Sequence, residues 1–328
     1  MKLASLKSAG RDGALAVVDR DLTKCALVPR IAHTMQQAIE TWSTAAPKLK
    51  AVYQHLNDGT AEHTEPFAPE RAESPFPRAY QFLDGSVYLS HMQKARKARG
   101  AEMPANFETE PLMYQGMSDG FIGPADDMTL PSDELGVDFE AEIAVVVDDV
   151  PMGTSAVDAM GHIKLVMLLN DFTLRTLTRS ELPKGFGFMQ AKPTSAFSPV
   201  AVTPDDLPQW DGQKLNVRLI SSVNSRKIGS PHAGHDMYFS YPQLIAHAAR
   251  TRKLGAGTII GAGTVANKHE AAGSSCIAEV RANEEIARGK PITPFLKFGD
   301  RVRIDVLDEA GRTIFGAIDQ RITKVPAA

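Results

Sequence analysis

The chain has 328 residues, of which 43% are hydrophobic and 23% are charged, and its formal net charge is −3. This composition is typical of a globular protein with a large core or two domains, and it gives no support to nucleic acid binding, because the densest basic cluster, Lys94 to Arg99, fits a solvated helix face. The two cysteines, Cys25 and Cys276, show neither the spacing of metal ligands nor a disulfide framework. We also see no signal segment and no apolar run long enough to span a membrane, so we expect a cytoplasmic protein.

Residues 1–75 are expected to form a small N-terminal domain. Leu15–Asp19 reads as a strand, and Thr34–Gly59 carries helical spacing of its apolar residues. The tract from Pro66 to Tyr80 then holds four prolines in fifteen residues. Because proline lacks the N–H and fixes φ, this tract should be extended. We therefore place the joint with a second domain, residues 76–328, in this tract.

Asp84 and His91 lie in the segment DGSVYLSH. Asp84 is a candidate N-cap of a helix that continues through LSHMQKARKA. Positions seven apart on a helix are two turns apart on nearly one face, so both side chains would look into the same space. A lone histidine is usually structural, whereas a histidine held near a metal-binding acid is a candidate general base.

The stretch from Val137 to Asp149 alternates as a strand does, with Glu140 and Glu142 on the same face. A strand with one solvated face often carries glutamate, which is the simplest interpretation. Against it, AVVV follows at once, and two like charges about 7 Å apart repel each other. A cation between them would remove this repulsion, and hard divalent ions bind carboxylate oxygens.

Asp171 ends the apolar run VMLLN within the segment from His162 to Pro199. Since burial of an unpaired charge is costly, this acid is a candidate site residue, although an aspartate that caps a turn explains it equally well. Arg175 and Lys192 add positive charge nearby, and each of them alone reads as a surface residue.

The rest of the chain predicts strands with one clear helix. The helix, Ser240 to Gly255, has Ser240 as its N-cap, Pro242 in its first turn and Gly255 as its C-cap. The strands, separated by long gaps, predict a mostly antiparallel or mixed sheet. The glycine-rich segment Gly255–Gly263 follows a helix and contains a strand, so it does not fit a dinucleotide-binding fingerprint.

Several motifs follow one another in an order that resembles the fumarylacetoacetate hydrolase (fumarylacetoacetase) family, in particular a bacterial member, over about residues 76–328. They are D-x6-H at Asp84 and His91, PLMYQG at Pro111–Gly116, F-E-A-E at Phe139–Glu142, N-D-x-x-x-R at Asn170–Arg175, Lys192 before a Ser/Thr-rich turn, G-x-G-T at Gly261–Thr264, and a C-I-A-E strand at Cys276–Glu279. The ordered combination is specific, and the D-x6-H element points to fumarylacetoacetases proper.

The resemblance implies a fold and a role for each matching position. The fold is β-rich α+β, a mixed β-sandwich or roll of the fumarylacetoacetase C-terminal type preceded by a small N-terminal α/β domain, in a homodimer. The implied ligands of a divalent Mg²⁺, Mn²⁺ or Ca²⁺ ion are Asp84, Glu140, Glu142 and Asp171. The implied catalytic residues are His91 as the base, Glu279 as its orienting partner and Lys192 to hold the substrate or polarise a carbonyl. The implied substrate contacts are Tyr114, Arg175 and Thr264.

The activity implied by the resemblance is hydrolysis of a carbon–carbon bond in a 1,3-diketo acid. The preferred substrate is fumarylacetoacetate, which gives fumarate and acetoacetate in the breakdown of tyrosine or related aromatic compounds. The chain departs from the family pattern at Thr176, where an aspartate is common, at Thr178, where the animal enzymes have a substrate-binding glutamine, and in its shorter N-terminal region. These departures concern the substrate more than the type of reaction.

Two kinds of alternative stay open. Within the same superfamily, the chain could be an acylpyruvate hydrolase, an oxaloacetate decarboxylase or a 2-oxo-enoate hydratase or isomerase. From a different class, it could be a metal-stabilised binding protein without turnover. The presence of both His91 and Glu279 favours an enzyme over the binding protein.

Overall fold

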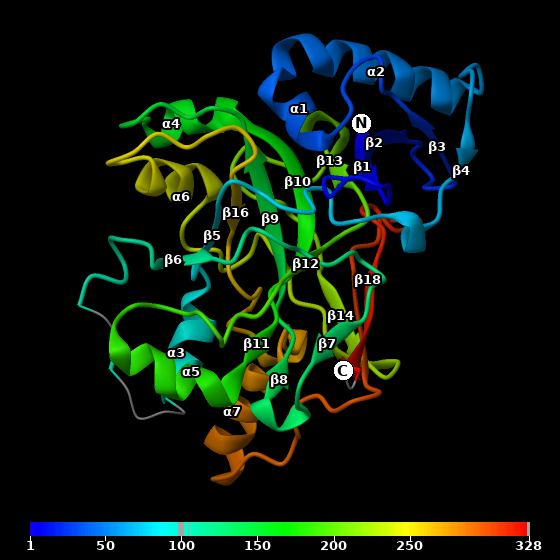
Figure 1. The fold of residues 1–328 in the computed structure, drawn as a ribbon. Helices are drawn as coiled ribbons and strands as arrows, with labels where there is room; N and C mark the ends of the chain where they lie inside the picture. The colour runs from blue at the N-terminus through cyan, green and yellow to red at the C-terminus, as the bar shows by residue number, and fades with distance from the viewer. Residues whose placement is uncertain (98–101, 104, 327–328) are drawn as a thin grey trace.

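One large mixed sheet runs through most of the molecule (Figure 1). A computed structural model describes residues 1–97, 102–103 and 105–326. From edge to edge, the sheet contains β4 (Glu65–Pro66), β3 (Lys24–Leu27), β2 (Ala14–Val18), β1 (Lys2–Leu6), β13 (Ala201–Val202), β10 (Ile163–Asn170), β9 (Ala141–Val147), β16 (Ile259–Gly261), β5 (Phe82–Gly85) and β6 (Met113–Gly116), with β12 (Ala196–Phe197) also paired to β10. Its neighbours are antiparallel except β5 and β16, so the prediction of a mixed sheet is confirmed.

A second sheet packs against one face of the first. It contains β15 (Arg226–Gly229), β14 (Ile220–Val223), β17 (Arg301–Asp305), β18 (Ile318–Lys324) and β7 (Met128–Leu130), and a separate pair joins β8 (Val137–Asp138) to β11 (Thr173–Leu174). Ile143 and Val145 of β9 share a buried cluster with Val302 and Ile304 of β17. The expected β-rich fold with stacked sheets is therefore what the structure shows.

The other face of the large sheet is covered near the N-terminus by α1 (Met35–Glu40) and α2 (Trp42–Asp58). The helical prediction for this segment is confirmed, with a break at Thr41 and a left-handed Gly59 that ends α2. Ala144 and Val146 of β9 lie in the same buried cluster as residues of these helices. Both faces of β9 are thus buried, which explains why its second half is apolar on both sides.

The remaining helices are α3 (Leu89–Lys97), α4 (Ala156–Ala159), α5 (Arg175–Glu181), α6 (Tyr241–Ala248) and α7 (Ile277–Arg288). Short 3-10 turns occupy Pro69–Arg71, Asp133–Leu135, Met160–His162, Leu182–Lys184, Pro204–Asp206 and Glu270–Ala272. Figure 1 shows α3, α5 and α7 gathered at the end of the molecule opposite α1 and α2. Among the helices that the structure describes, none combines the length and the apolar character of a membrane span.

The prediction for the helix after Ser240 is correct at its start and wrong at its end. Ser240 forms a capping box with Gln243, as its position predicts. The helix ends at Ala248 with Ala249 as the C-cap, so Gly255 is not the cap. The chain leaves the helix early because the backbone of Leu254 exchanges two hydrogen bonds with that of Val150, at 2.9 and 3.0 Å.

Candidate active site

Three buried carboxylates meet where the central strands of the large sheet end. Asp84 lies on β5, Glu142 on β9 and Asp171 directly after β10, and one oxygen of each lies within 4.8 Å of the others. Between β5 and β9 runs β16, in which Gly261 pairs with Asp84. A Cβ atom at this position would collide with Asp84 Oδ1, so the glycine leaves room for the carboxylate.

The electrostatics of this cluster fit a candidate site for a divalent cation. Burial, and then the charge of Asp171, raise the pKa of Asp84 to about 8. Burial, and then the charge of Asp84, raise the pKa of Glu142 well above its usual range. Within the described part of the chain, Glu142 Oε1 is buried without a hydrogen-bond partner. An all-oxygen donor set with an unpaired buried oxygen fits a hard cation such as Mg²⁺, Mn²⁺ or Ca²⁺.

Glu140 belongs to a different arrangement. Its carboxylate accepts from Arg175 Nη2 at 2.6 Å and from Lys192 Nζ at 2.5 Å. Lys192 Nζ also lies 2.5 Å from Asp171 Oδ2, so the ammonium bridges Glu140 to the carboxylate cluster. Burial alone would raise the pKa of Glu140, but Lys192 and Arg175 hold it well below its usual range. The role of Glu140 as a fourth metal ligand stays a prediction.

His91 and Glu279 form a pair on two neighbouring helices, α3 and α7. His91 Nδ1 lies 3.3 Å from Glu279 Oε2, and Lys94 Nζ donates to Glu279 Oε1 at 2.8 Å. Burial alone would raise the pKa of Glu279, but the hydrogen bond and charge of His91, with those of Lys94, hold it below its usual value. Since Nδ1 faces the carboxylate, Nε2 is the ring nitrogen that can accept a proton from water.

Two local predictions around this pair are wrong. Asp84 does not cap the helix that carries His91; it lies within β5, and the helix begins at Leu89. Strand β5 pairs on both sides, with β16 and β6, and this pairing outweighs the capping signal. The expected strand at Cys276–Glu279 is the N-cap and first turn of α7, so Glu279 shares a helix with Ile277. Strong helix formers from Ala278 onward and Gly289 as the C-cap were the signals for this helix.

Asp138 explains why α7 starts where it does. Its two oxygens accept from the backbone N–H groups of Ile277 and Ala278, at 2.7 and 2.9 Å. Arg175 Nε donates to Asp138 Oδ2 at 2.8 Å, so Arg175 is held between Asp138 and Glu140. The carboxylate sits at the positive end of the helix dipole. No motif in the sequence pointed to Asp138.

A single cavity of about 660 Å³ joins the carboxylates to the histidine. Its walls include every predicted site residue except Asp171 and Glu279, which lie behind them: Asp84, His91, Tyr114, Glu140, Glu142, Arg175, Lys192 and Thr264. Tyr114 donates to Asp171 Oδ2 at 2.5 Å, and Thr178 lines the same cavity. Sequence reasoning missed three further cations in the wall, Arg96, Arg179 and Arg281, because an isolated arginine gives no signal of its own.

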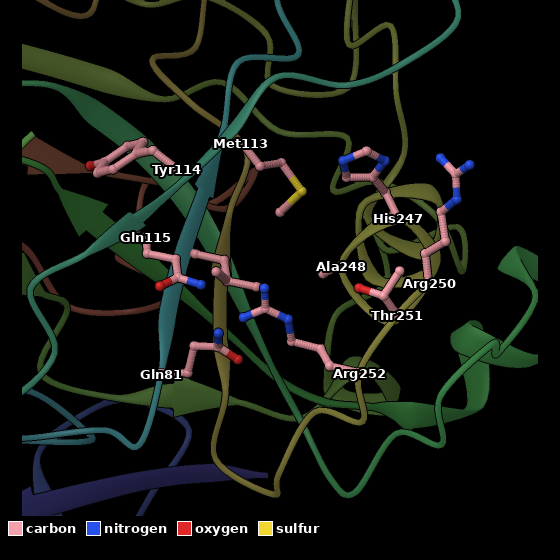
Figure 2. Close-up of a pocket in the computed structure, with 10 residues that line it drawn as sticks. Gln81, Met113, Tyr114, Gln115, His247, Ala248, Arg250, Thr251 and Arg252 are labelled. Atoms are coloured by element: carbon pink, nitrogen blue, oxygen red, sulfur yellow. The ribbon is translucent and has the colours of Figure 1, made fainter. Parts of the chain in front are cut away.

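A second, smaller pocket of about 290 Å³ lies on the opposite side of β6 (Figure 2). Figure 2 shows Met113 directed toward His247, while Tyr114 extends the other way, as alternation along a strand requires. Arg250 and Arg252 also line this pocket, which shares only Tyr114 and Met113 with the larger cavity. The residues that line it include no carboxylate, whereas Asp84, Glu140 and Glu142 line the larger cavity.

Two family models match nearly the whole chain. The family model described as "Fumarylacetoacetate (FAA) hydrolase C-terminal" matches residues 81–323, and the model described as "Fumarylacetoacetase N-terminal domain 2" matches residues 1–78. Oxaloacetate tautomerase YisK of Bacillus subtilis is 26% identical over 238 residues, which are 72% of this chain and 68% of that protein.

Two solved structures share the fold. The maleylpyruvate hydrolase from Sphingobium sp. SYK-6, in complex with manganese(II) ion and pyruvate, is 17% identical with a TM-score of 0.65, over 99% of this chain and all of that chain. The fumarylacetoacetate hydrolase from Exiguobacterium antarcticum is 16% identical with a TM-score of 0.66, over the same shares of the two chains. At this level of identity the likeness concerns the fold.

Proposed function

Because the chain belongs to the fumarylacetoacetate hydrolase family, we propose that it is a metal-dependent hydrolase that cleaves a carbon–carbon bond in a 1,3-diketo acid. The observation that supports this most is the placement of His91 and Glu279. They form a base with its orienting partner, and His91 lines the same cavity as Asp84 and Glu142. A hydrolase needs such a base next to a site that binds the carbonyl, since water must be deprotonated where it attacks.

In this proposal the divalent cation is held by Asp84, Glu142 and Asp171, whose oxygens are already gathered. When bound, the cation polarises the ketone oxygen and stabilises the enolate that leaves. Glu140 is the proposed fourth ligand, and it would have to exchange part of its contact with Lys192 for the cation. Lys192 and Tyr114 lie beside this cluster, and each would donate a hydrogen bond to a substrate oxygen by exchanging a contact that it makes with the acids, Tyr114 with Asp171 and Lys192 with Asp171 or Glu140.

His91 carries the proton in the proposed reaction. Nε2 takes a proton from water, and the hydroxide adds to the carbonyl carbon. The bond between this carbon and its neighbour then breaks, and the electron pair leaves with the enolate carbon, which takes up a proton. Glu279 keeps Nδ1 protonated and stabilises the imidazolium, as the acid does in hydrolytic triads.

The wall of the cavity favours an acidic substrate with a second carboxylate. Arg179 and Arg281 line the cavity in addition to the cations that are paired near the carboxylate cluster. Guanidinium groups bind carboxylates in a bidentate manner. Fumarylacetoacetate has a carboxylate at each end, and we propose it as the preferred substrate, which would place the enzyme in aromatic amino-acid breakdown.

The similarity to an oxaloacetate tautomerase supports a second candidate, proton transfer on a 2-oxo acid without bond cleavage. In either proposal a cation in the carboxylate cluster would bind a 2-oxo or 1,3-dioxo unit, so this cluster does not discriminate between them. The products do: hydrolysis gives two acids from fumarylacetoacetate, whereas tautomerisation changes only the enol content of oxaloacetate.

The decisive variant is His91→Ala in the Mg²⁺- or Mn²⁺-loaded enzyme. A general base contributes about 10²–10⁴-fold, so the turnover of fumarylacetoacetate should fall by about this factor while metal content stays at the wild-type level. Glu279→Gln should lower turnover less, and the double variant should be little worse than His91→Ala, because the two residues act as one unit. The measurements are product formation by chromatography and bound metal by elemental analysis.

Two outcomes would contradict parts of this proposal. One is an unchanged rate of fumarylacetoacetate turnover in His91→Ala, which would make the histidine structural and remove it as the general base. The other is a wild-type enzyme that tautomerises oxaloacetate rapidly and leaves fumarylacetoacetate and acylpyruvates intact. The second result would indicate that the chain is a tautomerase that uses the same proposed metal site.

A further inference from the structure

A free thiol lies beside the His91–Glu279 pair. Three potential ligand atoms lie within 4.8 Å of one another, one from each of His91, Cys276 and Glu279. Cys276 is completely buried, and the only other cysteine of the chain, Cys25, lies in β3 of the N-terminal part. The proposed reaction does not use Cys276. The cluster is therefore a separate set of donors within the same region.

The fold holds this thiol firmly in place. Cys276 is the N-cap of α7, and its Sγ accepts from the backbone N–H of Glu279 at 3.3 Å. Glu279 lies in the first turn of the same helix and His91 in α3, which packs against it. Asp138 anchors the start of α7 through the next two N–H groups. Three donors of different chemistry thus converge from two helices.

The donors differ in kind from those of the carboxylate cluster. Asp84, Glu142 and Asp171 offer only oxygen, which suits hard ions. The set of His91, Cys276 and Glu279 offers nitrogen, sulfur and oxygen, which suits Zn²⁺. In a tetrahedral zinc site, bonds of about 2.0–2.3 Å place the ligand atoms about 3.5 Å apart. The atoms of the present cluster lie at most 4.8 Å apart, so the longest separation has to shorten by about 1 Å for zinc to bind, and His91 Nδ1 and Glu279 Oε2 are already 3.3 Å apart.

We propose that His91, Cys276 and Glu279 form an inhibitory site for a thiophilic divalent cation such as Zn²⁺, distinct from the hard-metal site. On binding, the thiol releases its proton to solvent and the thiolate becomes a ligand. Lys94 gives up its contact with Glu279, and water is the fourth ligand. His91 binds zinc through Nδ1, which faces Glu279, and gives up the Nδ1 proton while Nε2 becomes protonated. With its proton on Nε2, the imidazole can no longer take a proton from water. The binding part of this inference is independent of the proposed hydrolase reaction.

Binding is tested with Co²⁺, because cobalt bound to a thiolate gives a charge-transfer band in the near ultraviolet. The protein for the titration is Cys25→Ala, saturated with Mg²⁺, in which Cys276 is the sole thiol. We expect the band to appear and to saturate as Co²⁺ is added. Cobalt in the all-oxygen cluster gives no such band. Absence of the band in Cys25→Ala would overturn the proposal without any need for a second variant.

The matched variant is Cys276→Ser, which keeps an N-cap oxygen for α7 but removes the thiolate. We expect it to lack the cobalt band. Loss of an outer partner of a metal ligand weakens metal binding about 10–100-fold, so loss of a direct ligand should raise the Zn²⁺ concentration for half-inhibition at least about tenfold. Each variant is compared with its own zinc-free rate, in excess Mn²⁺.

Equal zinc sensitivity in Cys276→Ser and Cys25→Ala would show that zinc acts at the carboxylate cluster, and would overturn the inhibitory role. A chain that never cleaves diketones would overturn the proposed function but leave the cobalt band as expected. The two failures are therefore distinguishable.

Discussion

Glu140 and Glu142 are two residues apart on one face, yet they have opposite surroundings. Lys192 and Arg175 neutralise Glu140, which therefore stays ionised. Among the described residues, no cation pairs with Glu142, whose neighbours are the carboxylate of Asp84 and the N–H of Gly263. The same side chain is thus an ion-pair member at position 140, which would reach the cation only by exchanging part of its contact with Lys192, and an unpaired candidate metal ligand at position 142.

The substitution Glu→Gln should separate these two roles. Glu142→Gln should change the stability of the metal-free protein by less than about 1 kcal/mol, because burial disfavours the charged carboxylate and raises its pKa, and the amide has the same size. The same substitution should weaken metal binding at least about tenfold. Glu140→Gln should destabilise the protein by about 3–5 kcal/mol, because it breaks a buried ion pair. Urea unfolding and metal titration of both variants measure this difference.

A Glu142→Gln protein that binds metal as well as the wild type would remove Glu142 from the ligand set. Unchanged stability in Glu140→Gln would contradict the ion-pair role that we assign to Glu140.

At the scale of elements, the start of α7 connects the two halves of the site. Asp138 ends β8 and accepts from the first N–H groups of α7, while Arg175 at the start of α5 links Asp138 to Glu140. Three elements that are far apart in the chain meet at one buried carboxylate. The position of Glu279 relative to His91 therefore depends on Asp138, which lines neither pocket.

Asp138→Asn should destabilise the protein by about 1–3 kcal/mol, since the amide can accept at only one oxygen and loses the charge that pairs with Arg175. Turnover should fall as well, because Glu279 lies in the first turn that Asp138 anchors. The control is Asp158→Asn, the same substitution in the first turn of the exposed helix α4. We expect this variant to lose less than about 0.5 kcal/mol of stability. Equal effects at both positions in urea unfolding would contradict the anchoring role.

At the scale of the whole molecule, the proposed metal site should couple to folding. The large sheet runs without interruption from the N-terminal strands, through the β1–β13 pair, to the strands that carry Asp84 and Glu142. The site thus gathers acids that the unfolded chain keeps apart. Whether residues 1–75 are a domain of their own stays a prediction, as do the homodimer and the cytoplasmic location.

Without metal, stability should fall as pH rises from about 4 to about 8. The pKa of Asp84 is raised to about 8, so over this range the native state keeps a proton that the unfolded chain has lost. Metal binding displaces this proton, so metal affinity should rise up to about tenfold per pH unit in the same range and level off above it. Thermal unfolding with Mg²⁺ and with a chelator, at pH 5 to 9, measures both effects.

In Asp84→Asn the metal-free pH dependence should become smaller. A metal-induced rise in Tm that is the same at pH 5 and pH 8 would contradict the coupling.

The sequence by itself determined the class of the fold and most of the candidate site. Alternation and apolar runs identified β9 and β10, capping signals identified the start of α6, and ordered short motifs pointed to Asp84, Glu142, Asp171 and His91. These signals are local or nearly so. The element signals depend on the periods of strands and helices and on the cost of burying charge, which a single segment can show, whereas the roles of the site residues came from the resemblance that the ordered motifs carry.

Only the tertiary structure decided which partner each charge has. It made Asp84 a strand residue through pairing on both sides, and it turned the segment after Cys276 into a helix by placing Asp138 at its start. It also joined Glu140 to Lys192, and Cys276 to His91. Partners such as these are tens to hundreds of residues apart in the chain. The distances between these partners, which determine their pKa values and the sets of possible metal ligands, follow from how the sheets and helices pack. Such contacts produce no periodic pattern in the sequence, so the sequence does not predict them.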